Sequence, residues 1–443
     1  MSRQIKSVAI CGTGTMGSGI AALCANMGLP VLFLDLPSNG EARNAISAAA
    51  LERMQAGRQP MLKDEDALAR VQIGNFDDDL VRISDYELIV EAIIEDLGVK
   101  REFVEKVESL RSDGSIVATN TSGIMLAKIT EGLGDRLARD IAVTHFFNPV
   151  LVMKLVELIP GENSDNEVID CLSSFLADDL GKGVVLAKDT VNFIANRIGC
   201  FWLLNGLNST GTALEAGCTM EEIDAALSKP IGVPPTGLFG LWDLIGLDVM
   251  DLVAANLRDN LPAGDVGLAY AKLPQVAQDM LARGQIGRKA GAGFYRMSKT
   301  GDGERFKETF DVAAGDWRGS AFGKLPDNLL NAIGLLFDDG PLSKLAWQVM
   351  GGTLLYAADL VPQISDDVVN IDNAMRWGFG WHQGPFELLD ALGPARIIDR
   401  LEAEGRPIPK MLQVIKGTGE DSFYRKNGAE YLGLHGAWHS VHF

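Results

Sequence analysis

The sequence predicts an α/β fold in which an N-terminal Rossmann-like domain is followed by two related all-α domains. Three observations predict it: short β-branched runs alternate with helical stretches, this alternation stops after Lys188, and a helical motif then occurs twice. At 443 residues, 47% of them hydrophobic, the chain can form more than one core. We predict a Rossmann-like domain over residues 1–187, helical domains over 188–296 and 341–443, and a connector over 297–340.

The Rossmann-like domain is predicted from five short apolar runs separated by helical stretches, the pattern of a parallel sheet with crossover helices. The predicted strands are residues 8–11, 31–34, 88–92, 116–118 and 141–144. The Ala-, Glu- and Arg-rich stretch from 40 to 80 departs from this spacing and is predicted to be a helical insertion.

The two helical domains are predicted from an internal repeat. Ile223-Asp224, followed by Gly232, Gly237, Asp243 and Gly246, is echoed by a second series of the same residue types. That series is Ile371-Asp372, Gly380, Gly384, Asp390 and Gly393. Two copies of one helical unit are the simplest explanation, and residues 297–340 between them, rich in Gly, Asp and Lys, resemble a connector.

A glycine-rich turn directly follows the first predicted strand. It comprises Gly12, Gly14, Thr15, Met16 and Gly17, and it opens an amphipathic helix. Such a turn lets a pyrophosphate approach backbone N–H groups at a helix N-terminus. The next strand ends in Asp35, where a carboxylate accepts hydrogen bonds from a ribose diol and repels a 2′-phosphate. The spacing favours dinucleotide binding, with NAD rather than NADP, over a structural turn with a surface aspartate.

His145 is one of only five histidines and stands at the end of the fifth predicted strand. Ligands of open α/β sheets gather outside the carboxyl ends of the strands. Glu157 follows in an apolar run, where a carboxylate needs a partner. If the two segments pair, Glu157 fixes the tautomer of His145 and stabilises its imidazolium form. A structural histidine with satisfied hydrogen bonds is the alternative.

Longer motifs add a resemblance to a known family. They are Cys-Gly-Thr-Gly-Thr-Met-Gly at 11–17, Glu-Ala-Ile-Ile-Glu at 91–95 with Lys100, Asn-Thr-Ser at 120–122, His-Phe-Phe-Asn-Pro-Val-Leu-Val-Met-Lys-Leu-Val-Glu at 145–157, Lys-Asp-Thr at 188–190, Phe-Ile-Ala-Asn-Arg at 193–197 and Gly-Arg-Lys-Ala-Gly-Ala-Gly-Phe-Tyr at 287–295. With them the chain resembles the 3-hydroxyacyl-CoA dehydrogenases of fatty-acid β-oxidation. It is similar to the form with a duplicated C-terminal helical domain, found in multifunctional β-oxidation enzymes.

The resemblance implies NAD-dependent oxidation of (S)-3-hydroxyacyl-CoA to 3-oxoacyl-CoA, with His145 and Glu157 as a catalytic dyad. It implies that Ser122 and Asn196 contact the reacting oxygens of the substrate. It also implies that NAD is held by a further set of residues: Asp35, Glu95, Lys100, Ser122, Asn148 and Lys289. Many relatives have Pro-Gly where this chain has Val191-Asn192, and a second Ser where it has Gly123, so the shape of the acyl pocket differs.

Composition bears on partners and location. The net charge of −19 repels nucleic acid but permits a local basic patch for CoA, to which Arg53, Arg58 and Lys63 are candidates. The five cysteines suggest reduced residues of a cytoplasmic protein, and no apolar window is long enough to span a membrane. No metal site is expected. The resemblance implies an enoyl-CoA hydratase half or subunit as a partner.

Two other functions remain open on the sequence alone. One is a dehydrogenase of a CoA-free 3-hydroxy acid, and the other is a non-catalytic NAD-binding scaffold. The combination of His145, Glu157, Ser122 and Asn196 argues against the scaffold. Lys344 stands in the second copy where Asn196 stands in the first, so we expect the second copy to be architectural and to replace a dimer partner.

Overall fold

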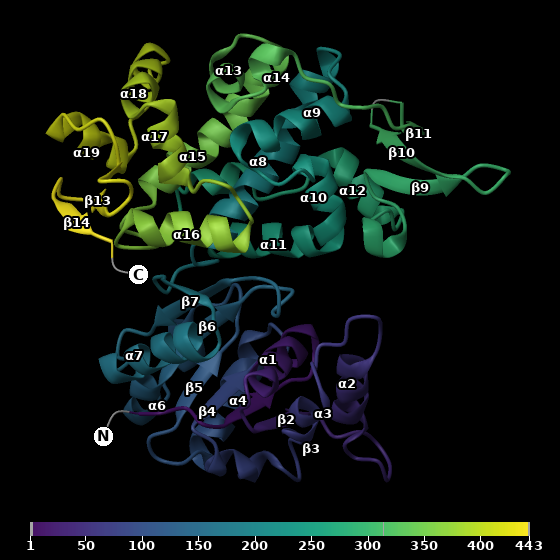
Figure 1. Cartoon of the computed structure of the whole chain (residues 1–443), viewed down its shortest axis with the longest axis vertical. Coiled ribbons are helices and arrows are strands. Elements are labelled where there is room, and N and C mark those ends of the chain that lie inside the picture. The colour runs from purple at the N-terminus through teal and green to yellow at the C-terminus, as the bar shows by residue number, and fades with distance from the viewer. Residues whose placement is uncertain (1–2, 313, 442–443) are drawn as a thin grey trace. The chain divides into compact units, whose positions relative to one another are not determined.

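The computed structural model describes residues 3–312 and 314–441 and separates into two compact units, Met1–Ile194 and Ala195–Phe443 (Figure 1). The first unit is α/β and the second is mainly helical, as the sequence predicts. Each unit is described by itself.

The first unit is built on an eight-stranded sheet in the order β3-β2-β1-β4-β5-β6-β7-β8. Its strands are β1 (Val8–Cys11), β2 (Val31–Asp35), β3 (Val71–Asn75), β4 (Leu88–Glu91), β5 (Ile116–Thr119), β6 (Ile141–Phe146), β7 (Leu155–Pro160) and β8 (Gly183–Leu186). The first six in this order are mutually parallel, whereas β7 pairs with β6 antiparallel. The order of β3 to β6 is that of the Rossmann fold.

Helices connect the parallel strands. They are α1 (Thr15–Asn26), α2 (Ala45–Gln55), α3 (Glu65–Ala69), α4 (Leu97–Leu110), α5 (Leu126–Thr130), α6 (Asp135–Asp140) and α7 (Asn166–Ser174), with the short helical turns η1 (Leu80–Asp85) and η2 (Phe175–Asp179). Helix α1 is almost wholly buried and packs on β1 and β2 and on α2 and α3. The small residues of α1 permit this close packing. The N-terminus of α1 therefore lies close to the carboxyl end of β1, which precedes it in the chain.

The prediction for residues 40–80 was wrong in part. Helices α2 and α3 lie there, but the stretch also holds β3, an edge strand that pairs with β2. Its sequence, VQIGN, is short and includes Gln72, Gly74 and Asn75, so it lacks the continuous apolar run of a buried parallel strand. Strands β7 and β8 were also not predicted, because an antiparallel strand at this end breaks the strand–helix alternation.

The second unit is formed mainly by helices. These are α8 (Ala195–Glu215), α9 (Met220–Ala226), α10 (Gly237–Ile245), α11 (Leu247–Asn260), α12 (Gln275–Ala282), α13 (Ala332–Phe337), α14 (Pro341–Ala346), α15 (Gly352–Asp359), α16 (Val368–Gly378), α17 (Pro385–Leu392), α18 (Pro394–Ala403) and α19 (Lys410–Thr418), with short turns η3 (Lys229–Ile231), η4 (Val266–Tyr270), η5 (Arg288–Ala290), η6 (Asp327–Leu329) and η7 (Trp347–Gly351). The long helix α8 packs against α14, α15 and α16, so residues from both sequence copies bury it.

The repeated aspartates make matching hydrogen bonds in the two copies. Asp224 accepts from the N–H groups of Phe239 and Gly240 and from the hydroxyl of Tyr295. In the second copy, Asp372 accepts from the N–H groups of Phe386 and Glu387 and from the hydroxyl of Tyr424.

The second aspartate of each copy repeats the pattern. Asp243 accepts from the N–H groups of Phe294 and Tyr295, and Asp390 accepts from those of Phe423 and Tyr424. The repeated residues therefore hold a tyrosine-bearing strand against two helices in each copy.

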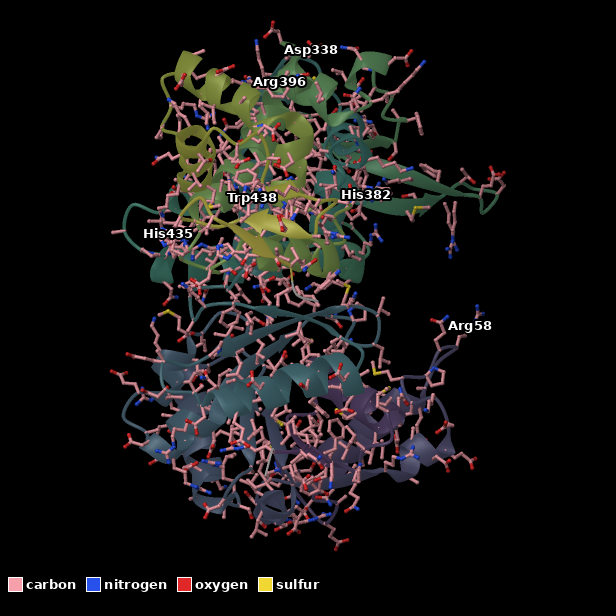
Figure 2. All side chains as sticks on the ribbon, turned by 60° about the vertical axis from the view of Figure 1, so that its left-hand side comes forward. Arg58, Asp338, His382, Arg396, His435 and Trp438 are labelled. Carbon is pink, nitrogen blue, oxygen red and sulfur yellow. The ribbon has the colours of Figure 1, made fainter. Side chains whose placement is uncertain are left out.

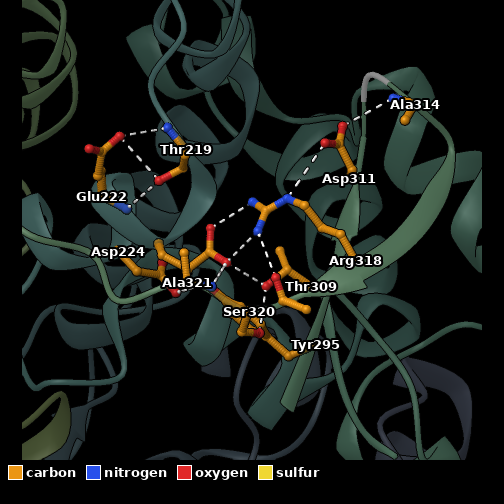
Figure 3. Close-up of polar contacts among 12 residues, drawn as sticks. Thr219, Glu222, Asp224, Tyr295, Thr309, Asp311, Ala314, Arg318, Ser320 and Ala321 are labelled. Atoms are coloured by element: carbon orange, nitrogen blue, oxygen red, sulfur yellow. Dashed lines mark hydrogen bonds and ion pairs between the residues drawn. The ribbon is translucent and has the colours of Figure 1, made fainter. Parts of the chain in front are cut away.

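The connector contains structure that the sequence did not predict. Strands β9 (Tyr295–Lys299), β10 (Arg305–Asp311) and β11 (Asp316–Gly319) form an antiparallel sheet. Buried Glu221 ties it to α9, because both carboxylate oxygens accept from Arg318 and Oε1 also accepts from Thr309 (Figure 3). Burial would raise the pKa of Glu221, but these bonds lower it to about 2.

A second small sheet, β12 (Tyr424–Arg425), β13 (Glu430–Leu432) and β14 (Trp438–Ser440), follows the helices of the second copy. Across residues 3–312 and 314–441, none of the helices has the length and hydropathy of a membrane span. All five cysteines are free.

Candidate active site

The carboxyl ends of the parallel strands gather most of the predicted site residues of the first unit. The glycine turn follows β1, Asp35 ends β2, Glu95 follows β4, and Ser122 follows β5. His145 lies near the end of β6, and the amide oxygen of Asn120 accepts from Phe146 N, joining the ends of β5 and β6. Because these strands are parallel, their ends lie along one edge of the sheet, where α/β proteins bind ligands.

The glycines of the turn differ in what surrounds them. A Cβ on Gly12, whose φ is +107°, would lie 2.4 Å from the carbonyl oxygen of Ala92, and one on Gly17 would lie 1.8 Å from that of Gly12. Next to Gly14 the space is open, and no side chain caps the first turn of α1. The turn therefore offers backbone donors and room for a pyrophosphate, so these residues fit the phosphates of a dinucleotide.

Asp35 is held by the same turn. Its Oδ2 accepts from the backbone N–H of Thr13 at 2.6 Å and from the Thr13 hydroxyl at 2.5 Å, while its Oδ1 accepts from Leu36 N at 2.7 Å. The carboxylate is thus fixed at the end of β2, and Thr13 is a positioning residue that the sequence did not single out.

Exposed Glu95 and buried Lys100 belong to one charge network. The ammonium of Lys100, only 1% exposed, lies 2.7 Å from Glu91 Oε1 and 3.3 Å from Glu95 Oε2. Glu95 Oε1 accepts from the N–H groups of Ser122 and Gly123. Burial would raise the pKa of Glu95, but Lys100 and these donors outweigh it and lower the pKa. Lys100 therefore holds Glu95, and Glu95 holds the Ser122 loop.

His145 and Glu157 form a cross-strand pair. They are opposite residues in the antiparallel register of β6 and β7, and His145 Nδ1 lies 2.6 Å from Glu157 Oε2. The side chains are 4% and 0% exposed. A carboxylate only accepts hydrogen bonds, so in the neutral imidazole the proton lies on Nδ1 and Nε2 is left to accept one. The rings of Phe147 and Phe193 flank the imidazole, at centroid distances of 4.5 and 5.6 Å.

The other oxygen of Glu157 is held by a strained segment of backbone. Glu157 Oε1 accepts from Ile194 N at 3.0 Å, and the two preceding residues, Asn192 and Phe193, have φ values of 61° and 50°. This left-handed region costs most side chains energy and is occupied mainly by Gly, followed by Asn. Asn192 therefore suits a position at which many relatives have Gly.

Lys182 is a further residue that the sequence analysis missed. It is buried before β8, and its ammonium donates to the carbonyl oxygens of Val150 and Met153, at 2.5 and 2.8 Å. Desolvation lowers its pKa. The two carbonyls belong to the loop that joins β6 to β7, so Lys182 supports the hairpin that carries the dyad. A single lysine in Gly-Lys-Gly gives no sequence indication of this role.

The remaining predicted residues have different settings. Ser122 and Asn148 are exposed in the first unit. Asn196 and Lys289 lie in the second unit, Asn196 in the first turn of α8 and Lys289 in η5, where its ammonium pairs with Asp248 at 2.7 Å. Arg53, Arg58 and Lys63 are exposed, and Arg58 projects from the loop between α2 and α3 (Figure 2).

The fold and these residues define a class of protein: a Rossmann-fold protein with an acidic residue at the end of the second strand and a buried histidine–carboxylate pair at the carboxyl edge of the sheet. Sequence comparison gives the family. Residues 7–190 match the model of the 3-hydroxyacyl-CoA dehydrogenase NAD binding domain, and residues 193–297 match that of the 3-hydroxyacyl-CoA dehydrogenase C-terminal domain. The chain belongs to the 3-hydroxyacyl-CoA dehydrogenase family.

Curated relatives match along most of the chain. A probable 3-hydroxyacyl-CoA dehydrogenase of Bacillus subtilis is 34% identical over 469 aligned residues, which cover 100% of this chain and 58% of the relative. A putative fatty acid oxidation complex trifunctional enzyme of Rickettsia felis is 36% identical over 419, covering 93% and 57%. The chain thus spans a little over half the length of these relatives.

A solved structure shares the fold over nearly the same extent. The 3-hydroxybutyryl-CoA dehydrogenase of Escherichia coli aligns with a TM-score of 0.68 and 24% identity, covering 93% of this chain and 98% of its own.

Proposed function

We propose that the chain oxidises (S)-3-hydroxyacyl-CoA to 3-oxoacyl-CoA with NAD, in fatty-acid β-oxidation, and that His145 and Glu157 are its catalytic dyad. The observation that carries the proposal is the buried 2.6 Å contact between His145 and Glu157 at the edge of the sheet that also carries the glycine turn. A structural histidine does not require a carboxylate as its partner. A general base that becomes charged during the reaction benefits from one.

In the proposed mechanism, Nε2 of His145 accepts the proton of the substrate's 3-hydroxyl group. Glu157 keeps the imidazole in the required tautomer and stabilises the positive charge that then forms. NAD, held by the residues named below, would supply the acceptor for the hydride that leaves C3. Ser122 and Asn196 are proposed to hold the reacting oxygens. Orientation of this kind lowers the activation free energy because the reacting groups are already aligned.

The residues proposed to hold NAD have separate tasks. The turn from Gly12 to Gly17 binds the pyrophosphate, and Asp35 binds a ribose diol and disfavours NADP. Glu95, supported by Lys100, orients the Ser122 loop, because its carboxylate binds two N–H groups there. Asn148 and Lys289 are proposed to complete the site.

The proposed reaction is tested by assaying NADH formation with 3-hydroxyacyl-CoA thioesters of several chain lengths and both configurations at C3. Turnover of the (S)-thioesters alone is expected. Turnover of free 3-hydroxy acids in place of thioesters would indicate the CoA-free dehydrogenase. Binding of NAD without turnover of any of these compounds would indicate the scaffold.

A hydratase partner is proposed because the Rickettsia relative is named a trifunctional enzyme and extends well beyond the matched region. An enoyl-CoA hydratase produces the 3-hydroxyacyl-CoA that this reaction consumes.

The free cysteines support a cytoplasmic setting.

The second helical copy is proposed to replace a dimer partner. It buries α8 of the first copy: Asn205 donates to Gln348 O, and buried Arg197 donates to the hydroxyl of Tyr356. A helix with this much apolar surface is stable only when another element buries that surface. The second copy is part of the same chain, so it is present near α8 at a high effective concentration.

A further inference from the structure

A hollow of about 930 Å³ in the second unit is rich in positive charge. It lies beside α10, η5 and the β9–β10 hairpin, which projects from the helices (Figure 1). Its lining includes five cationic side chains and one carboxylate. The cations are Arg288, Arg296, Lys299, Arg305 and Lys307, and the carboxylate is Asp243. This concentration is notable in a chain of net charge −19.

The hairpin separates its paired and unpaired cations onto two faces. Arg296 is opposite Glu308 and bonds to it at 2.7 Å. On the other face, Lys299 is directly opposite Arg305, and Lys307 is the next residue of β10 on that face. Within the described part of the chain, these three cations form no ion pair within 4.0 Å. Like charges directly opposite each other destabilise a hairpin.

The second copy shows that the fold does not require these charges. Its equivalent hairpin has the pair Arg425 and Glu430, which are opposite and bonded at 2.5 Å, and it ends shortly beyond them. The matching hollow is lined by Asp372, Glu387 and Asp390 and by a single arginine, Arg376. The unpaired cations are therefore specific to the first copy.

Asp243 and Asp224, beneath the first hollow, accept hydrogen bonds from the protein itself. Asp243 accepts two backbone hydrogen bonds, and burial raises its pKa to about 6. Asp224 accepts from Tyr295, and burial raises its pKa to about 7. Lys307 lies over the Tyr295 ring, with its ammonium 3.4 Å from the centroid, and desolvation lowers its pKa. A bound anion would relieve the repulsion among these cations.

We propose that this hollow binds the phosphate-rich end of a nucleotide, through Lys299, Arg305, Lys307 and Arg288. Phosphate groups supply several acceptor oxygens and the multiple negative charge that unpaired lysines and arginines favour. The shared chemistry is a phosphorylated adenosine, either the 3′-phospho-ADP end of CoA or a free nucleotide such as ATP. The existence of this site does not depend on the proposed catalytic activity.

The test is a calorimetric titration of the whole chain, saturated with NAD, with adenosine 3′,5′-bisphosphate in low-salt buffer. Lys299→Glu is expected to weaken binding about 10-fold or more, since charge-assisted contacts are lost and a repulsion is added. The same substitution creates an opposite-charge pair with Arg305, so the melting temperature should rise or stay constant. Lys272→Glu is the matched control, because Lys272 is exposed in the same unit and outside the hollow.

Three outcomes overturn the proposal: no bisphosphate binding by the wild type, equal affinity in Lys299→Glu and wild type, or an equal loss in Lys272→Glu. A triple variant, Arg53→Ala/Arg58→Ala/Lys63→Ala, is also compared with Lys299→Glu. If only the triple variant loses binding, the probe occupies the α2–α3 loop and the proposal is overturned. Competition by CoA against ATP identifies the source of the phosphates. Since no turnover is measured, failure of the proposed reaction leaves this result unaffected.

Discussion

At the residue scale, Glu157 uses both carboxylate oxygens, one for His145 Nδ1 and one for Ile194 N. The substitution Glu157→Gln leaves only one acceptor for two donors. We expect kcat to fall about 10-fold, since a charge-assisted bond exceeds a neutral one by about 1.4 kcal/mol, and the free energy of unfolding to fall by about 1–3 kcal/mol.

Steady-state kinetics and urea unfolding measure these two effects of Glu157→Gln. Glu162→Gln, on an exposed glutamate, is the matched control and should match the wild type. Unchanged kcat in Glu157→Gln would show that the carboxylate has no role beyond packing.

Asp35 determines the expected cofactor preference. In Asp35→Asn the negative charge that repels a 2′-phosphate is removed, while one side-chain oxygen remains to accept from either Thr13 or Leu36. The ratio of kcat/KM for NAD to that for NADP should fall about 10-fold or more, on the scale of one charged contact. The wild type should prefer NAD. Equal use of both cofactors by the wild type would contradict this assignment.

At the scale of single elements, the segment before α8 stores backbone strain next to the dyad. Asn192 has a φ of 61°, so Asn192→Gly should retain the stability of the wild type, whereas Asn192→Ala should lower the free energy of unfolding by about 1 kcal/mol. Chemical denaturation tests the difference. Equal stability of the two variants would mean that the strain is not significant.

The sequence predicts buried strands well where they alternate with helices. The apolar runs of β1, β2, β4, β5 and β6 were recognised, together with the glycine turn and Asp35 at their ends. The apolar strand β7 was not, because no helix separates it from β6, and β3, β9 and β10 were not, because polar residues interrupt their apolar runs. Residues that act through others, such as Thr13 and Lys182, were also missed, since their roles depend on contacts between distant segments.

The dyad could be suggested from the sequence but not established from it. His145 and Glu157 face each other because β7 reverses direction after β6, and spacing alone does not determine that register. The motif resemblance supplied the assignment, and the antiparallel pairing gives its geometry.

At the scale of the whole molecule, buried aspartates of both copies should make stability depend on pH. Burial raises the pKa of Asp224 and Asp390 to about 7, from 3.8. The folded chain then binds more protons than the unfolded chain between these values, so the free energy of unfolding should decrease as pH rises from about 4 to 7. Asp390→Asn should flatten this dependence. A wild-type stability that increases over this range, with the same profile in the variant, would contradict it.

The second copy should be needed to cover α8. Ending the chain at residue 340 keeps the β9–β11 sheet, which Glu221 holds, and removes Tyr356 and Gln348, which accept hydrogen bonds from Arg197 and Asn205. We expect the shortened chain to dimerise or aggregate, measured as mass by light scattering. A shortened chain that stays monomeric and as stable as the full chain would show that the second copy covers nothing essential.

The central claim is that His145 is the general base of a 3-hydroxyacyl-CoA dehydrogenase, and the most direct measurement is the kcat of His145→Gln beside its affinity for NAD. Histidine and glutamine are similar in volume, so the substitution opens no large cavity beside the neighbouring rings of Phe147 and Phe193. The account predicts that kcat falls by about 10²-fold or more while NAD binding stays nearly unchanged. Near-native turnover of a 3-hydroxyacyl-CoA by this variant would contradict it.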